Sequence, residues 1–306
     1  MEQGFLDVMT PPAVENPGME VHIHPFQLYS VHKKELQPLY LHTSPEFCMK
    51  ELLASDEDFN KIFTLTYAFR DEVSSPIHRP QFVMLEWYRK HERYETIMKD
   101  VENLLRYIVV HGAKKGLILK EPQGPFKMIK MTMQELFLAE LNIDILNYLD
   151  VPSIKILLKS FPDVPVPESE LEWEDYFFLL YLNKIEPMIS KKYPFLLISE
   201  FPAPLSALST LKKSDPRVCE RFEVYINGIE ICNSFNELTD CVEQKKRFLQ
   251  QTALKRKLYQ YELPEPKSFY KIMDHGLPPS AGIALGVERV LYSLFLEESP
   301  FWNHQS

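Results

Sequence analysis

The chain has 306 residues, 45% of them hydrophobic and 25% charged, a composition that excludes a disordered or collagen-like protein. Its 34 basic and 43 acidic residues give a net charge of −9, which disfavours a protein that mainly binds phosphate backbones. The sequence has 24 prolines, only 9 glycines, and neither GxGxxG nor GxxxxGK[ST], which argues against a Rossmann or P-loop nucleotide site.

Neither the cysteines nor the apolar segments indicate a structural metal, secretion or a membrane span. The four cysteines lack the CxxC spacing that is typical of a structural zinc site. The longest apolar run covers residues 177–182 and is far shorter than the roughly 20 residues that cross a bilayer. No signal-peptide pattern opens the chain, so we expect a cytoplasmic protein without membrane contact.

The first two thirds of the sequence mix predicted strands with predicted helices. Strands are predicted where β-branched and aromatic residues cluster between turn residues. One helix is predicted to begin at residues 43–46, where a hydroxyl cap, a proline and an acidic residue form a start signal. The predicted strands cover residues 4–12, 21–31, 37–42, 61–70, 82–89 and 195–200, and further helices cover about 93–110, 132–148 and 171–192.

The last third contains a predicted hairpin and a strand that runs into a helix. Residues 221–231 form two strand-like runs around Asn227-Gly228, which is the strongest short-range hairpin signal. A charged helix is predicted over 238–258, a strand over 282–286 and an apolar helix over 287–295. Together these elements predict an α+β fold, an antiparallel β-sheet flanked by helices, rather than a βαβ fold.

The hairpin places two carboxylates on one face of the predicted sheet. An Asn227-Gly228 turn pairs Tyr225 with Glu230 and Glu223 with Cys232. Paired residues and residues two apart share a face, so Glu223 and Glu230 are predicted to be diagonal neighbours about 7 Å apart. Two carboxylates that close repel unless a divalent cation or a proton lies between them. Two interpretations stay open: a magnesium site, or a solvated face on which both acids point to water.

Two further segments carry residues that suit a nucleoside triphosphate. Residues 69–72 end one predicted strand, and a polar loop leads to Phe82 on the next. Residues 282–289 form a glycine-flanked strand that enters a helix. Arg70 and Arg289 suit a bidentate grip on phosphates, and Phe82 is suited to stack on a purine. Taken singly, however, an arginine at a strand end is more often a surface salt-bridge partner.

These segments resemble the three signature motifs of class II aminoacyl-tRNA synthetases. Residues 4–12 resemble motif 1, residues 69–88 motif 2, and residues 282–294 motif 3. Residues 41–50 and 228–240 are similar to the amino-acid pocket segments of the lysyl branch of this class. The likeness covers nearly the whole chain and extends to the small synthetase paralogues that attach (R)-β-lysine to a lysine of translation elongation factor P.

The resemblance implies roles for residues of motifs 2 and 3. Arg70 would hold the α-phosphate of ATP and the carboxylate of the amino acid, while Arg289 would hold the γ-phosphate. Phe82 would stack on adenine, and Glu72 and His78 would contact adenine or the phosphates. The implied chemistry is adenylation, in which positioning and charge neutralisation supply most of the acceleration.

The resemblance also implies a lysine pocket and a magnesium site. A buried ammonium needs carboxylate and hydroxyl partners to offset its desolvation. The matching pocket positions are Glu46, Glu86, Tyr88, Asn233 and Glu237, with Ala284 at the pocket wall. Ala284 stands where tRNA-charging lysyl enzymes more often have glycine, which favours the β-isomer of lysine. Glu223 and Glu230 match the acidic pair that binds Mg²⁺ beside ATP.

The implied protein is a ligase that uses ATP and Mg²⁺ to activate lysine or (R)-β-lysine and transfers it to elongation factor P. Only four residues precede Phe5, so we expect neither an anticodon-binding domain nor the long helix before motif 1, and a single catalytic domain over residues 1–306. This expectation and the net charge argue against tRNA and DNA as partners. A homodimer stays open, because that helix builds the dimer interface of the class.

Two alternatives also stay open: a shortened lysyl-tRNA synthetase-like enzyme with another acceptor, and a catalytically silent binding homologue. Motif 2 departs from its usual pattern, because Gln81 replaces an acidic residue near adenine. Ser75 or Pro76 stands where an arginine is usual, and Arg79 is suited to replace it. Lysine-dependent exchange of pyrophosphate into ATP separates the enzymes from the silent homologue.

Overall fold

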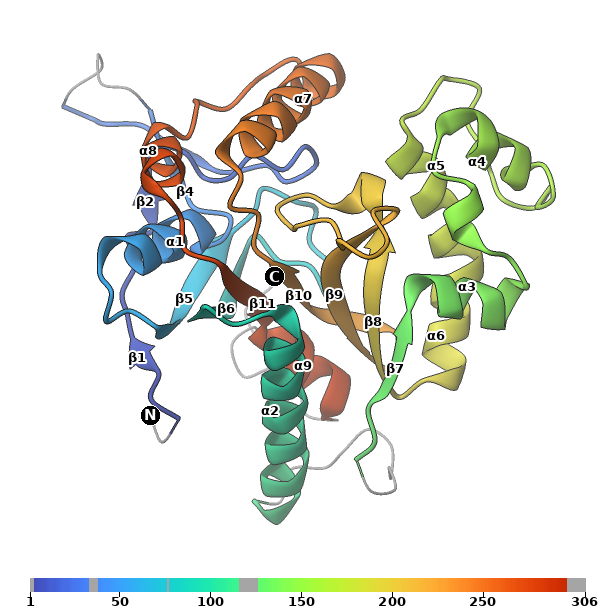
Figure 1. The fold of residues 1–306 in the computed structure, drawn as a ribbon, viewed down its shortest axis with the longest axis horizontal. Coiled ribbons are helices and arrows are strands. Elements are labelled where there is room, and N and C mark those ends of the chain that lie inside the picture. The colour runs from blue at the N-terminus through green and yellow to red at the C-terminus, as the bar shows by residue number, and fades with distance from the viewer. Residues whose placement is uncertain (1–2, 33–37, 76, 116–125, 296–306) are drawn as a thin grey trace. The chain divides into compact units, whose positions relative to one another are not determined.

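The computed structural model describes residues 3–32, 38–75, 77–115 and 126–295 (Figure 1). The chain divides into two compact units, each with its own strands and helices. Unit 1 comprises Met1–Arg93 and Glu237–Glu288, and unit 2 comprises Tyr94–Asn236 and Arg289–Ser306. The predicted α+β class is confirmed. The single catalytic domain over residues 1–306 stays a prediction.

Unit 1 contains four neighbouring strands, in the order β1 (Leu6–Asp7), β5 (Lys61–Phe69), β6 (Gln81–Lys90) and β11 (Ser280–Gly286). β6 pairs antiparallel with both β5 and β11, whereas the short β1 runs parallel to β5. A separate small sheet has the order β2 (Ala13–Val14), β4 (Leu39–Leu41) and β3 (Gln27–Leu28). The long β6 lies between β5 and β11 and carries Phe82, Glu86 and Tyr88, the last part of motif 2.

The described helices of unit 1 are α1 (Glu46–Ser55), α7 (Cys241–Tyr259) and α8 (Lys267–His275). Met49 and Leu53 of α1 are fully buried in one cluster with Tyr88 of β6. Phe47 of α1 stacks on Phe269 of α8, with ring centroids 4.5 Å apart. Packing on both sides fixes the first turn of α1 against the sheet.

Unit 2 contains four strands in the order β10 (Ile229–Asn236), β9 (Val218–Ile226), β8 (Phe195–Pro202) and β7 (Ile129–Thr132). β9 pairs antiparallel with both neighbours, and β7 runs parallel to β8. The predicted hairpin is confirmed. Asn227 and Gly228 have φ values of 50° and 82°, the left-handed conformation that a two-residue hairpin turn of this type requires.

The helical elements between residues 133 and 192 form the main core of unit 2 together with residues of β8 and β9 (Figure 1). Trp173, Phe177 and Tyr181 stack along one side of this helical group, with centroid distances of 5.2 and 5.8 Å. The helical elements are α2 (Tyr94–Lys114), α3 (Met133–Leu141), η1 (Ile145–Asn147), α4 (Val151–Leu158), α5 (Trp173–Leu180), the π-helical η2 (Tyr181–Ile185), α6 (Glu186–Lys192), η3 (Ala203–Leu205) and, from Arg289 onward, α9 (Val287–Leu294). Across the described ranges, no helix combines the length and the apolar composition that a membrane span requires.

Several predicted elements differ from the structure. The strand predicted over 21–31 is reduced to β3, because the Lys255 ammonium donates to the backbone carbonyls of residues 20, 21 and 23 and no strand pairs there. The strand predicted over 4–12 is reduced to β1. The helix predicted over 132–148 ends early because Asn142 adopts a left-handed conformation, with φ 56°. Helices α4 and α8 were not predicted, and residue 37, the start of another predicted strand, lies outside the described residues.

Candidate active site

A buried cluster of charged side chains lies where α1 faces β6 in unit 1. The Lys50 ammonium is 2.6 Å from Glu46 Oε1, one helical turn earlier, and 2.6 Å from Glu237 Oε2. The Lys50 and Glu237 side chains are each 1% exposed. Lys50 therefore joins α1 to the segment that follows β10 in the sequence.

The site face of β6 adds a third carboxylate to this cluster. Glu86 is fully buried, and its Oε1 accepts a hydrogen bond of 2.7 Å from the Tyr88 hydroxyl. Its other oxygen has no hydrogen-bond partner in the structure. Ala284 of β11 is paired with Glu86 and is only partly buried, unlike its fully enclosed neighbours on that strand. The free oxygen of Glu86 is a buried acceptor that suits a donor from a bound molecule.

The proximity of these groups displaces their pKa values. Burial, reinforced by the charge of Glu46, raises the pKa of Glu86 well above its ordinary value. Burial also raises the pKa of Glu237 to about 8, although Lys50 acts in the opposite direction. For Lys50, burial favours the neutral amine, but the two carboxylates outweigh it and raise its pKa. The cluster therefore holds a charged lysine beside carboxylates that resist ionisation until more positive charge arrives.

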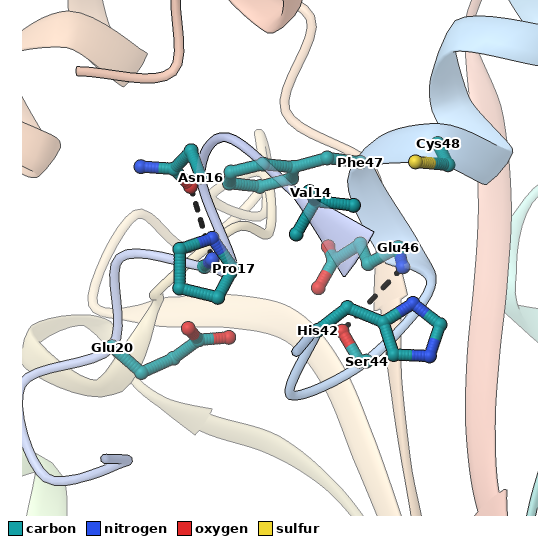
Figure 2. A pocket seen from close by; sticks show the side chains of 10 residues that line it. Val14, Asn16, Pro17, Glu20, His42, Ser44, Glu46, Phe47 and Cys48 are labelled. Carbon is teal, nitrogen blue, oxygen red and sulfur yellow. Dashed lines mark hydrogen bonds between the residues drawn. The ribbon is translucent and has the colours of Figure 1, made fainter. Parts of the chain in front are cut away.

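Glu20 and Glu46 line a pocket of unit 1 (Figure 2). Asn16, His42 and Ser44 contribute further polar groups to the lining. Burial, followed by the charge of Glu46, raises the pKa of Glu20, while Arg70 and Lys255 oppose this shift. The pocket therefore has an acidic lining with basic groups close to it.

Arg70 and Phe82 lie together at the two ends of the motif 2 loop. The Arg70 guanidinium is 5.1 Å from the centroid of the Phe82 ring, and its Nε donates to the Thr43 carbonyl at 3.4 Å. The loop closes on itself where the ring of His78 hydrogen-bonds with the Ser75 hydroxyl at 3.0 Å. Arginine over an aromatic ring offers a charged and a flat surface side by side.

The rest of the motif 2 loop lies next to this pair. Glu72 and His78 are partly exposed, and the Glu72 backbone N–H donates to the Arg70 carbonyl at 3.0 Å. Pro76, one of the two positions at which motif 2 lacks its usual arginine, lies outside the described residues. In motif 3, the two carboxylate oxygens of Glu288 accept the Val83 N–H at 2.8 and 2.9 Å, which ties the start of the helix to β6.

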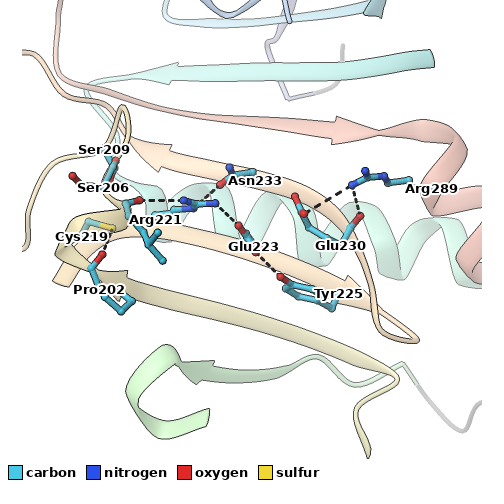
Figure 3. Close-up of polar contacts among 11 residues, drawn as sticks. Pro202, Ser206, Ser209, Cys219, Arg221, Glu223, Tyr225, Glu230, Asn233 and Arg289 are labelled. Carbon is cyan, nitrogen blue, oxygen red and sulfur yellow. Dashed lines mark hydrogen bonds and ion pairs between the residues drawn. The ribbon is translucent and has the colours of Figure 1, made fainter. Parts of the chain in front are cut away.

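In unit 2, a polar row follows the hairpin strands (Figure 3). The Glu223 carboxylate accepts hydrogen bonds from Arg221 on one oxygen and from the Tyr225 hydroxyl, at 2.6 Å, on the other. The Arg221 guanidinium also donates to Asn233 Oδ1 and to the Leu205 carbonyl, both at 3.1 Å. The buried Glu223 is thus held by two donors and is not solvated.

Glu230 and Arg289 form a looser and more exposed pair in unit 2. Arg289 Nη1 donates to the Glu230 carbonyl at 3.1 Å and lies 3.9 Å from Glu230 Oε2 (Figure 3). The Glu230 side chain is 40% exposed and that of Arg289 is 25% exposed. Both side chains therefore remain accessible to a ligand.

The register of the hairpin corrects one prediction. Tyr225 pairs with Glu230 as predicted, but Glu223 pairs with Asn233 and not with Cys232. The reason is a bulge at residue 231, which adds one residue to β10 between the two pairs. Since Glu230 is paired with Tyr225 and Glu223 lies two residues from Tyr225, both carboxylates still share a face. The interpretation of a merely solvated pair is wrong for Glu223, because it is buried and bonded.

Comparison with protein-family models matches residues 1–299 to the family described as tRNA synthetases class II (D, K and N). The chain belongs to this family. Several similar proteins carry the name elongation factor P–(R)-β-lysine ligase. The relative from Edwardsiella ictaluri is 33% identical over 292 residues, which cover 95% of this chain and 84% of the relative. The relative from Hamiltonella defensa is 34% identical over 294 residues, with coverage of 95% and 84%. The relative from Buchnera aphidicola is 32% identical over 305 residues, with coverage of 97% and 87%.

The structure places the predicted residues of this synthetase in two groups, one in each unit. The unit 1 group contains Arg70, Glu72, His78 and Phe82 of motif 2 together with Glu46, Glu86, Tyr88, Glu237 and Ala284. The unit 2 group contains Glu223, Glu230, Asn233 and Arg289. Within each unit, residues far apart in the sequence come together, as Lys50 and Glu237 do. Their roles stay predictions.

The residues at the hairpin fit a magnesium ion that is shared with a nucleotide. Among the described residues, no group of three or more His, Cys, Asp or Glu side chains could hold a metal alone. Mg²⁺ usually takes one or two protein carboxylates and completes its shell with phosphates and water. The accessible Glu230 and the bonded Glu223 supply such a pair, and each Glu223 oxygen keeps a further lone pair.

Sequence reasoning missed three charged residues that lie beside predicted site residues. Lys50 ends the segment that resembled the amino-acid pocket, and its spacing of four from Glu46 was the available signal. Arg221 lies two residues before Glu223, on the same face of β9. Glu20 carried no signal, because its segment has no regular structure.

Proposed function

We propose that the protein is an ATP-dependent ligase that activates lysine or (R)-β-lysine as an adenylate and transfers it to a lysine of elongation factor P. The names and the coverage of the relatives support this acceptor and this amino acid. Membership of the synthetase family supports the use of ATP. Cytoplasmic localisation, the exclusion of tRNA and DNA, and a homodimer stay predictions.

The observation that carries the proposal is the carboxylate cluster of unit 1. Lys50 joins Glu46 to Glu237, and the buried Glu86, on which the charges of both carboxylates act, keeps an unused acceptor. A substrate that carries two ammonium groups offsets the cost of burying such carboxylates, because each charge gains a partner. Both isomers of lysine carry two ammonium groups, and we assign the cluster to them.

In the first step, an oxygen of the amino-acid carboxylate attacks the α-phosphorus of ATP. The bond from that phosphorus to the β-phosphate oxygen breaks, and pyrophosphate leaves. We assign Arg70 to the α-phosphate and the carboxylate, Phe82 to the adenine ring, and Arg289 to the γ-phosphate. Fixed guanidinium groups stabilise the charge that develops on the phosphoryl oxygens. Glu72 and His78 complete the nucleotide site.

We assign Glu223 and Glu230 to Mg²⁺, and Asn233 to the amino-acid site. When bound, the ion neutralises charge on the phosphates. Arg221 and Tyr225 hold the Glu223 carboxylate in one orientation by donating to both of its oxygens. In the second step, the neutral amine of the acceptor lysine attacks the adenylate carbonyl, AMP leaves, and the amine loses a proton as the amide forms.

Two measurements test this function. The first is exchange of labelled pyrophosphate into ATP with each lysine isomer, which we expect to depend on the amino acid. The second follows label from the amino acid to elongation factor P or to tRNA in parallel reactions, and we expect transfer to the factor alone. Efficient charging of tRNA without modification of the factor would overturn the acceptor, and the absence of exchange with both isomers would favour a silent homologue.

A further inference from the structure

Lys50 is a buried lysine of unit 1 that is held between two carboxylates. Its ammonium has 2.6 Å contacts to two carboxylates, and its side chain is 1% exposed. The Phe269 ring centroid lies 5.8 Å from the same nitrogen. A lysine rarely loses its hydration so completely unless its charge is needed where it lies.

Lys50 changes the charge that the cluster presents. Glu46 and Glu237 contact the ammonium, and the charges of all three residues act on the buried Glu86, so the cluster with every carboxylate ionised has a formal charge of −2. Glu20 is not included in this count, because Arg70 and Lys255 offset part of the repulsion between its carboxylate and that of Glu46. The residual charge of −2 equals in size the charge of the two ammonium groups of a diamino acid.

The Glu86 carboxylate is the acceptor at which an ammonium group of a ligand would bind. Glu86 Oε2 is buried and has no hydrogen-bond partner in the structure. Glu86 Oε1 is held by Tyr88, so the carboxylate has a defined orientation. A ligand with two ammonium groups gives both remaining carboxylates a charged partner, whereas with a ligand that has one ammonium a buried carboxyl keeps its proton and gains no ion pair.

Building on the proposed function, we propose that Lys50 is a specificity-determining residue that acts through Glu46 and Glu237. Its fixed ammonium neutralises one of three carboxylates, so that the cluster matches an amino acid with two ammonium groups and rejects one with a single ammonium. Lys50 also holds the two carboxylates in place before the substrate arrives. It is a positioning residue, since it acts on the substrate through its two partners.

Three variants separate this role from a purely structural one: Glu46→Gln, Lys50→Met and the double variant with both changes. Their formal cluster charges are −1, −3 and −2. The measurement is the ratio of kcat/KM for lysine to that for norleucine, which lacks the second amino group, in pyrophosphate exchange. The lysine isomer is the one that the wild-type protein uses better.

We expect Glu46→Gln to reduce the lysine-to-norleucine ratio at least tenfold. Two carboxylates remain in this variant, and Lys50 neutralises the charge of one, so only one is left for an ammonium group of the substrate. The double variant removes that cation and frees Glu237 and Glu86 for the two ammonium groups. It should regain most of the lost ratio. Lys50→Met alone should raise the KM for lysine at least tenfold with a smaller change in kcat, because one excess carboxylate remains.

A matched control is Arg106→Met, which removes an exposed cation from a Glu–Arg pair of the same i,i+4 spacing on α2. It should leave the ratio unchanged. If the double variant discriminates no better than Glu46→Gln, the role assigned to Lys50 is wrong. This test does not depend on the folding of Lys50→Met. The double variant removes the lysine together with Glu46, so it leaves one buried carboxylate fewer without a partner than Lys50→Met does. If the wild-type protein exchanges pyrophosphate with neither lysine isomer, the proposed function itself fails.

Discussion

The ring of Tyr88 lies directly over Gly282 on the neighbouring strand. A Cβ atom built on Gly282 would be 2.1 Å from Tyr88 Cε1, closer than any real contact. The two residues are paired between β6 and β11, and the Tyr88 hydroxyl reaches Glu86 at 2.7 Å. The absence of a side chain at position 282 therefore sets the orientation of a candidate substrate carboxylate.

Gly282→Ala should displace the Tyr88 ring and release Glu86. We expect a loss of stability of about 1–3 kcal/mol from overpacking, together with a KM for lysine raised at least tenfold. Urea unfolding and pyrophosphate exchange measure the two effects. Ala281→Gly, at the adjacent position, removes a methyl group from the other face and serves as the control for β11. Unchanged kinetics in Gly282→Ala would show that Tyr88 does not position the carboxylate.

Arg70→Ala and Arg289→Ala should each abolish adenylation while leaving the fold intact. Both guanidinium groups are only partly buried, so their loss creates no cavity in a core. The loss of a charge-assisted contact in the transition state lowers the rate about 100-fold or more. Pyrophosphate exchange and circular dichroism test the two halves of the prediction. Near-wild-type exchange in either variant would contradict the role of that arginine.

Glu223→Gln and Glu230→Gln should differ although both residues belong to the predicted metal pair. Each change should weaken binding of Mg–ATP, because Mg²⁺ accepts few substitutes for its oxygen ligands. Only Glu223→Gln should also lower stability, by about 1–3 kcal/mol, because it breaks the buried contact with Arg221. Calorimetric titration and thermal unfolding measure the two properties. Unaltered Mg–ATP affinity in both variants would rule out the pair.

Binding of lysine should release protons near neutral pH. In the free protein, burial raises the pKa of Glu237 to about 8 and holds the pKa of Glu86 well above its usual range. The ammonium groups of the substrate favour the ionised carboxylates, so binding lowers these pKa values. The affinity for lysine should therefore rise with pH and level off near pH 8. Calorimetry in buffers of different ionisation enthalpy measures the protons released.

Glu237→Gln supplies the control for this pH dependence. The amide cannot ionise, so this variant should release fewer protons and show a flatter profile. The stability of the free protein should fall with pH, whereas the affinity for lysine rises. The folded state binds the Glu237 proton more tightly than the unfolded state, so the stability that this proton contributes is lost as pH rises from about 4.5 to 8. An affinity for lysine that falls with pH over this range would contradict the assignment.

Local signals in the sequence predicted much of the fold. Asn227-Gly228 fixed the hairpin, because these two residues adopt the positive φ that the turn requires. The bulge at residue 231 left no such signal, since it depends on contacts made across the sheet. The pairing of Glu223 with Asn233, both of which accept a hydrogen bond from Arg221, could therefore not be predicted from the sequence.

Residues of the candidate site could be predicted only where they belong to a recognisable sequence motif. Glu46 and Lys50 are one helical turn apart, so their pairing is visible in the sequence, but Glu237 joins them only through the tertiary fold. The segment around residues 21–31 has the composition of a strand. Its carbonyls bond to Lys255 instead, because a distant helix supplies a donor that competes with strand pairing.

Lys255 therefore gives a last prediction about the acidic pocket. Its ammonium donates to the carbonyls of Glu20, Val21 and Ile23 at 2.9, 2.9 and 2.7 Å, which uses all three of its hydrogens. Lys255→Met would leave these carbonyls without their donor and should lower stability by about 2–4 kcal/mol.

The same change should loosen the segment that carries Glu20 and so raise the KM for lysine. Lys257→Met is the matched control, because Lys257 is exposed on the same helix, and its stability should stay within about 0.5 kcal/mol of the wild type. Urea unfolding and pyrophosphate exchange on both variants make the comparison. Equal stability of the two variants would show that Lys255 does not anchor the segment. If Lys255→Met loses stability but keeps its KM for lysine, Glu20 does not contribute to the amino-acid site.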